Sequence, residues 1–229
     1  SLLRKRWAVG IPEPVPIDIL DENLRDVPVA DLPTPLTSFI GRERELAEVI
    51  KLLTTSRLLT LVGPGGVGKS RLALRAAAEV GGQFADGVVF VSLADVGESK
   101  LVLPAVAKAL QVREGPGYPL LTALKAALRR RRLLLVLDNF EHVVEAGLPL
   151  AGLLATCANL TLLVTSRTVL HLSAEQVFEV PPLAVPDSAH SPPDRLTAFD
   201  SVRLFVERAK AASVEPTVTG DRLAAIAEI

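Results

Sequence analysis

The stretch from Gly63 to Ser70 reads GPGGVGKS and fits the spacing G-x-x-x-x-G-K-[ST] at every fixed position. Its glycines let the backbone fold so that successive N–H groups point at a bound polyphosphate. We expect Lys69 to reach the terminal phosphates of a nucleotide and Ser70 to bind Mg²⁺. The alternative, a glycine-rich turn without a ligand, is disfavoured because a strand is predicted before the motif and a helix after it. The candidate phosphate-binding residues are Gly63, Pro64, Gly65, Gly66, Val67, Gly68, Lys69, Ser70 and Arg71.

A second metal contact is expected at the end of a strand that neighbours the P-loop strand. The apolar run Leu133–Leu137 ends in Asp138, which is the Walker B pattern of P-loop proteins. Asp138 would then hold Mg²⁺ through water. Taken alone, the same Asp would be read as a capping residue after a strand. With a P-loop upstream, we predict the metal role.

The catalytic base is less evident from the sequence. Many P-loop hydrolases carry Glu directly after the Walker B Asp, whereas this chain has Asn139. An amide can orient water but cannot accept a proton. Glu141 is the nearest acid and could polarise water, although an exposed Glu at the start of a helix is the simpler interpretation. We therefore predict slow hydrolysis or none.

Two groups of arginines could contact phosphate. Arg167 follows the predicted strand Leu160–Thr165, and an Arg at the tip of a strand beside the P-loop strand could reach the γ-phosphate. The alternative is an arginine on the surface without a role. The run Arg129–Arg132 could touch nucleic acid, but cations at the C-terminus of a helix also complement its dipole, and we favour that interpretation.

Apolar periodicity predicts the elements that position these residues. Five short apolar runs alternate mostly with helical patterns, which predicts an α/β fold: an open, largely parallel sheet with helices on both faces. After a proline-rich boundary, two further helical patterns predict the start of a helical unit. The predicted strands are Leu58–Val62, Val88–Leu93, Leu133–Leu137, Leu160–Thr165 and Gln176–Val180. The predicted helices begin at Arg42 and cover Lys69–Val80, Ser99–Leu110, Pro119–Arg131 and Val143–Cys157, then Val202–Ala209 and Leu223–Ile229.

Composition narrows the class of protein. The chain has 229 residues, one Cys and a formal charge of −1, which excludes a disulfide framework and a chain-wide polybasic field. Ala146–Ser166 carries no charged residue, but its Gly, Pro and Thr content favours helix, turn and strand over a membrane span. We expect a cytoplasmic protein without a membrane partner.

Residues 1–36 hold six prolines and are predicted to form an arm or linker, or a strap on the domain. A helical pattern still running at Ile229 predicts a longer parent protein.

Taken in order, the motifs resemble those of STAND-class signalling ATPases, whose nucleotide-binding domain is also called NB-ARC. Thr37–Glu45 (TSFIGRERE) looks like the hhGRxxE box that opens this domain. The P-loop, Leu133–Val143 (LLLVLDNFEHV) and Leu162–Arg167 (LLVTSR) look like the next three signatures. Gln176–Leu183 and Ser201–Ala209 are similar to later segments of large bacterial LuxR- or SARP-type transcriptional regulators.

The resemblance implies a P-loop NTPase fold of the additional-strand type, with strand order 5-1-4-3-2. It implies ATP or ADP as ligand with Mg²⁺, bound by a domain over residues 37–183 and followed by a truncated helical lid over 184–229. The backbone around Phe39 and Ile40 would contact adenine, with Gly41 and Arg42 near the nucleotide. Relatives carry a GLPLA-like motif just after a helix similar to Asp221–Ile229, and its Pro packs on adenine; this sequence ends before that motif, which leaves the nucleotide affinity of this segment open.

In function, the resemblance implies a switch. ADP would hold a closed monomer, ATP would permit self-association of the full-length protein, and DNA would be contacted only through domains outside this chain. The main alternative is an AAA+-like ATPase that acts on nucleic acid, of the origin-recognition or helicase-loader type. Asn139 and the lack of a basic surplus argue against it. A phosphotransferase would need an Arg-rich substrate lid, and none is evident.

Overall fold

A five-stranded parallel sheet forms the centre of the protein. The computed structural model describes residues 32–34, 37–114, 118–186 and 193–212. The strands β1 (Leu58–Val62), β2 (Val88–Ser92), β3 (Leu133–Asp138), β4 (Leu160–Ser166) and β5 (Gln176–Glu179) lie in the order β2-β3-β4-β1-β5. Read from the other edge this is 5-1-4-3-2, so the order that the resemblance implied is confirmed.

The strands are apolar because they are covered on both faces. Every residue of β3 and β4 is buried, as expected for the middle of a parallel sheet. Residues of β3 alternate between two cores: Leu135 and Leu137 pack in one, Leu134 and Val136 in the other. β5 is an edge strand and is partly exposed.

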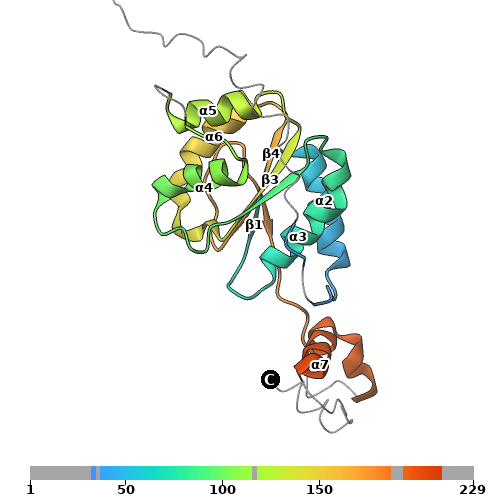
Figure 1. Ribbon diagram of the computed structural model, residues 1–229. Helices are drawn as coiled ribbons and strands as arrows, with labels where there is room; N and C mark the ends of the chain where they lie inside the picture. Colours follow the sequence, from blue (N-terminus) through green and yellow to red (C-terminus); the bar gives the residue numbers. More distant parts are fainter. Residues whose placement is uncertain (1–31, 35–36, 115–117, 187–192, 213–229) are drawn as a thin grey trace, which may run out of the picture.

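Helices cover both faces, as predicted (Figure 1). α2 (Glu43–Thr55) and α3 (Lys69–Val80) lie on one face. α4 (Val102–Ala109), α5 (Leu120–Leu128) and α6 (Gly147–Thr156) lie on the other. This arrangement places the β1–α3 connection at the carboxyl edge of the sheet, where the phosphate motif lies.

Two predicted helices begin later than the apolar pattern indicates. Short 3₁₀ turns, Ser99–Leu101 and Val144–Ala146, precede α4 and α6. The reason is a proline at the third position of each α-helix, Pro104 and Pro149. Proline has no N–H to bond the carbonyl four residues earlier, so the α-helix cannot extend further upstream. α5 also ends at Leu128 rather than Arg131, in a turn that leads into β3.

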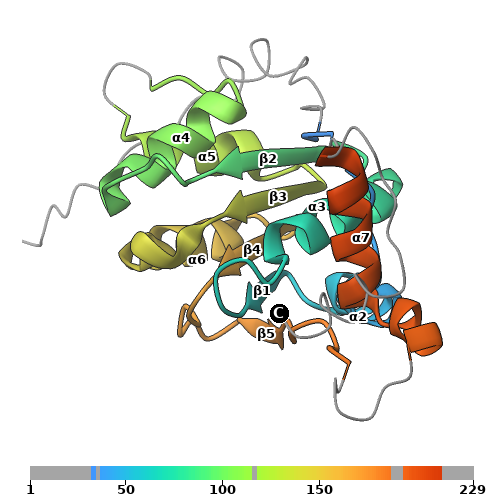
Figure 2. The same ribbon diagram turned by 90° about the horizontal axis from the view of Figure 1, so that it is seen from below.

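The predicted helix after the boundary is present and longer than its apolar pattern. α7 spans Asp200–Ala212 and follows a 3₁₀ segment, Pro193–Ala198. It lies below α2 and α3 in the view of Figure 1, and Figure 2, seen from below, shows it in front of them. The expected helix over 223–229 and most of the arm over 1–36 lie outside the described residues. Within the part of the chain that the structure describes, no helix is long and apolar enough to cross a membrane.

Candidate nucleotide-binding site

The phosphate motif forms the loop between β1 and α3. Gly63, Gly66 and Gly68 have φ angles of 153°, 79° and 96°, a region that favours glycine. Gly68 is the N-cap of α3, so the first N–H groups of that helix face the loop. The Lys69 ammonium donates hydrogen bonds to the carbonyls of Gly63 and Pro64 at 2.9 and 3.0 Å. The loop is therefore built as a cradle with a buried cation at its base.

Asp138 reaches the same edge of the sheet from β3. β4 lies between β1 and β3, so Asp138 is two strands from the P-loop strand rather than on its immediate neighbour. Thr165 of β4 fills the space between: its hydroxyl donates to Asp138 Oδ1 at 2.5 Å and accepts the Asn139 N–H at 3.0 Å. Thr165 is fully buried. It fixes the orientation of the Asp138 carboxylate, and the sequence analysis missed it.

The structure corrects the interpretation of Glu141 as an exposed residue. Its side chain is only 18% exposed, and its Oε1 accepts a hydrogen bond from Arg167 Nε at 3.0 Å. The other oxygen, Oε2, is buried without a hydrogen-bond partner. The Arg167 guanidinium in turn lies against the P-loop, since a Cβ placed on Gly65 would be 3.4 Å from Nη2. Glu141 and Arg167 thus form an ion pair beside the cradle.

Asn139 leaves β3 in a left-handed conformation with φ of 63°. Asn tolerates this region better than most residues, which gives the chain a sharp turn directly after Asp138. The turn carries Phe140–His142 back over the sheet edge as a 3₁₀ segment. Asn139 therefore has a structural reason for its identity in addition to any role toward water.

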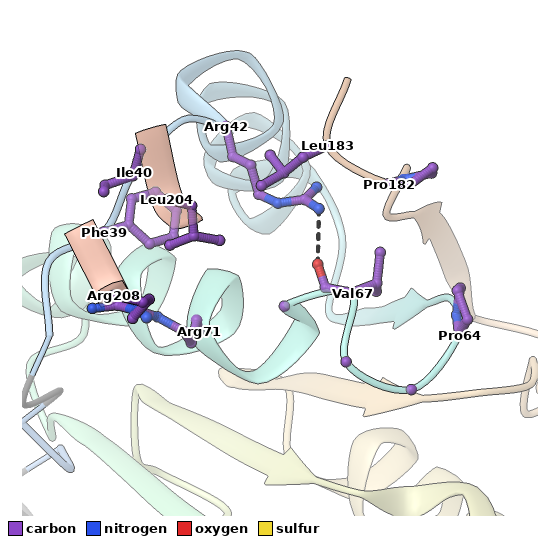
Figure 3. Close-up of a pocket in the computed structure, with 13 residues that line it drawn as sticks. Phe39, Ile40, Arg42, Pro64, Val67, Arg71, Pro182, Leu183, Leu204 and Arg208 are labelled. Atoms are coloured by element: carbon purple, nitrogen blue, oxygen red, sulfur yellow. Dashed lines mark hydrogen bonds between the residues drawn. The ribbon is translucent and has the colours of Figure 1, made fainter. Parts of the chain in front are cut away.

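The hhGRxxE box closes the other side of the loop (Figure 3). Arg42 is buried, and its guanidinium donates to the Val67 carbonyl at 2.8 Å and lies 3.4 Å from Glu45. Gly41 has φ of 68° and touches α7, because a Cβ at Gly41 would lie 2.7 Å from Asp200. The box therefore contacts both the P-loop and the helix that follows the boundary.

These parts enclose a pocket of about 550 Å³. One end is apolar and suits a planar base, while the other end is formed by the loop. The structure brings Phe39, Ile40 and Arg42 together with the loop, as expected, and adds four residues that the sequence analysis did not assign. The lining residues are Phe39, Ile40, Arg42, Pro64, Gly65, Gly66, Val67, Gly68, Arg71, Pro182, Leu183, Leu204 and Arg208. The four added residues are Pro182, Leu183, Leu204 and Arg208. They lie in the segments Gln176–Leu183 and Ser201–Ala209. The similarity of these two segments to those of bacterial regulators was the only sign in the sequence that they belong to the site.

A magnesium ion fits this site only together with a nucleotide. No group of three or more His, Cys, Asp or Glu side chains that could hold a metal occurs among the described residues. Mg²⁺ commonly takes one or two protein oxygens and completes its shell with phosphates and water. Ser70 and Asp138 are the candidates for that limited set, and the Thr165 hydroxyl donates a hydrogen bond to the Asp138 carboxylate.

Comparison with known proteins identifies the core. The family model described as "AAA domain" matches residues 52–175. An uncharacterized protein of Mycobacterium tuberculosis is 35% identical over 195 residues, which are 85% of this chain and 47% of that protein. A predicted HTH-type transcriptional regulator of the same species is 36% identical over 179 residues, 78% of this chain and 19% of the regulator.

Two further similarities are to a regulatory protein and to a solved structure. The regulatory protein AfsR of Streptomyces coelicolor is 32% identical over 142 residues, 54% of this chain and 14% of AfsR. The chain thus spans less than half the length of these relatives. Among solved structures, Cdc6p of Pyrobaculum aerophilum superposes with a TM-score of 0.57 at 17% identity, over 88% of this chain and 57% of that one. At this identity the likeness concerns the fold alone.

Proposed function

The chain belongs to the AAA domain family of P-loop NTPases, and on that premise we propose that it is the ATP- or ADP-binding switch domain of a STAND-class signalling or transcription-regulating ATPase. The observation that carries the proposal is the composite pocket. The P-loop, the hhGRxxE box and α7 all line it, so a bound nucleotide would touch both the sheet domain and the unit that follows it.

In this proposal each part of the pocket has one task. The amides at the start of α3 and the Lys69 ammonium bind the terminal phosphates. The apolar side chains of Phe39, Ile40 and Leu204 hold the base. Ser70 and Asp138 would hold Mg²⁺, which supplies neutralising charge to the phosphates when it is bound.

Slow hydrolysis follows from the groups beside the cradle. Asn139 cannot accept a proton. Glu141 can, but in this structure its Oε1 already accepts a hydrogen bond from Arg167 Nε at 3.0 Å, so that oxygen is occupied. We propose that Glu141 becomes free to polarise water only when Arg167 turns to the γ-phosphate of bound ATP, so turnover stays slow while the pair persists. Lys69, Asp138, Asn139, Glu141 and Arg167 are the candidate catalytic residues on this reading.

The signalling output of the protein would be carried by parts other than the sheet domain. The similarity to an HTH-type regulator, of which this chain covers 19%, supports DNA contact through other parts of a longer protein. We further propose self-association in the ATP state, with ADP favouring the closed form. The change from the closed to the self-associated form would release the contact between α7 and the hhGRxxE box.

The test is to denature freshly purified protein, identify released nucleotide, and follow Mg²⁺-ATP turnover on the same batch. The control is Lys69→Ala, and Glu141→Gln tests the base. We expect retained ADP, negligible turnover, and loss of both nucleotide and residual turnover in Lys69→Ala. Lys69-dependent turnover of about 1 s⁻¹ or more, the lower end for phosphoryl-transfer enzymes, would favour the nucleic-acid ATPase instead. Normal ADP affinity in Lys69→Ala would remove the P-loop assignment.

A further inference from the structure

Two arginines from different elements converge at the box end of the pocket (Figure 3). Arg71, in the first turn of α3, donates to Thr37 Oγ1 at 3.0 Å, to the Thr37 carbonyl at 2.8 Å and to the Ser38 carbonyl. Arg208 of α7 donates to the same Ser38 carbonyl at 3.0 Å. Both side chains line the pocket. Two guanidinium groups therefore share one acceptor.

Neither arginine is neutralised within the described part of the chain. Their recorded partners are a hydroxyl and backbone carbonyls. On the same two helices, by contrast, Arg75 pairs with Glu79 at 2.8 Å and Arg203 pairs with Asp200 at 2.9 Å. The charged residues that line the pocket are all arginines. Burial, and next the charge of Arg208, lower the pKa of Arg71, so the two cations interact unfavourably.

We infer that Arg71 and Arg208 form a second anion subsite, which holds the α-phosphate side of a bound adenine nucleotide. The inference rests on the proposed function and adds Arg208 of α7 to the candidate phosphate-binding residues, which already include Arg71. In a nucleotide the α-phosphate lies between the base and the terminal phosphates. Figure 3 shows the apolar side chains of Phe39, Ile40 and Leu204 at one side of the pocket and the loop residues Pro64 and Val67 at the other. Arg71 and Arg208 lie near the apolar side, and Arg71 is in the first turn of the helix that follows the loop.

The chemistry favours an anion at this point. A guanidinium carries five N–H donors, and those not used on Thr37 and Ser38 remain for a ligand. An anion between two guanidinium groups replaces their repulsion with charge-assisted hydrogen bonds. Because Arg208 is supplied by α7, the nucleotide would also hold that helix against the sheet domain.

The experiment measures the ADP dissociation constant by titration calorimetry at two salt concentrations, for the wild type, Arg71→Gln and Arg208→Gln. Lys210→Gln, an exposed position in the last turn of α7 and outside the pocket, is the matched control. We expect about tenfold or more weakening in both test variants, consistent with loss of a hydrogen bond to a charged group, and less than twofold in the control. The salt dependence of ADP affinity should also fall in the test variants, because fewer ionic contacts remain.

Two results would overturn the inference. Wild-type affinity in Arg208→Gln would show that no anion contacts it. Weakening by the same factor at both salt concentrations would show that Arg208 only supports the Ser38 backbone. If wild-type protein binds ADP in a Lys69-dependent way and either result is obtained, the anion subsite fails while the proposed function stands. If wild-type protein shows no Lys69-dependent ADP binding, both fail.

Discussion

At the scale of single residues, the site depends on side chains that touch no ligand. Thr165 is the clearest case, because its hydroxyl bridges the Asp138 carboxylate and the Asn139 amide. Without that donor, Asp138 would be a buried carboxylate free to rotate. The orientation of the Asp138 carboxylate therefore depends on the position of β4, the strand that carries Thr165.

We predict that Thr165→Val weakens binding of Mg²⁺-ATP by about tenfold while metal-free ATP is bound nearly as well. Valine keeps the shape but removes one donor and one acceptor, which costs about 1–3 kcal/mol for each buried group left unpaired. Parallel titrations with Mg²⁺ and with EDTA measure the two affinities. Thr165→Ser should restore the difference. An equal loss in both titrations would assign Thr165 a purely structural role.

Cys157 provides a residue-scale test of the core. It is fully buried directly after α6, and burial raises the pKa of its thiol despite the opposing charges of Lys125, Arg129 and Arg57. A raised pKa leaves less thiolate at any pH below it, and the thiolate is the reactive form. Native protein at pH 8 should therefore react with a thiol reagent at least about tenfold more slowly than protein in denaturant. Equal rates would mean that this end of α6 opens readily.

At the scale of elements, the sequence predicts those strands, helices and turns whose structure depends on residues close together in the chain. All five strands were found because each is a short run rich in apolar residues, although only β3 and β4 are buried along their whole length. The loop before α3 was found because its glycines are needed for its own turn. The starts of α4 and α6 were misplaced, since apolar periodicity continues through Pro104 and Pro149 although the hydrogen-bond pattern does not. Thr165 and Arg208 were missed for another reason: their roles depend on which elements become neighbours.

The contact between Gly41 and α7 is the element-scale prediction. Gly41→Ala would place a methyl group 2.7 Å from Asp200 and force a left-handed φ on a residue with a Cβ. The left-handed backbone alone costs about 1–2 kcal/mol. We expect a lower melting temperature and weaker ADP binding. Gly82→Ala, where a Cβ would meet nothing within 4 Å, is the control. If the two variants behave alike, α7 does not rest on Gly41.

At the scale of the whole molecule, the pocket joins two parts of the chain that the AAA domain match separates. The match ends at residue 175, whereas Leu204 and Arg208 lie in α7. A chain shortened to end at Pro186 would keep all five strands and both sheet-covering helix layers but lose part of the pocket wall.

We therefore predict that the shortened chain keeps the circular-dichroism spectrum of an α/β fold but loses stabilisation by ADP. For the longer chain, ADP at 100 times its dissociation constant should add about 2.7 kcal/mol to the free energy of unfolding. Thermal melts with and without ADP measure both effects, with Lys69→Ala as the variant that should not respond. The same ADP-induced shift in both chains would exclude α7 from the site.

The hydrogen bond between Arg208 and Ser38 spans 170 residues, which has a consequence for synthesis. The last strand of the sheet ends at Glu179, about 30 residues before Arg208. Ribosomes add about 5–20 residues per second, so the sheet is complete on the order of seconds before the pocket is. During that interval the nascent chain has its phosphate loop but only part of its base site. If ADP binds as proposed, it would therefore reach its full affinity only after α7 has been synthesised and has packed against the sheet domain.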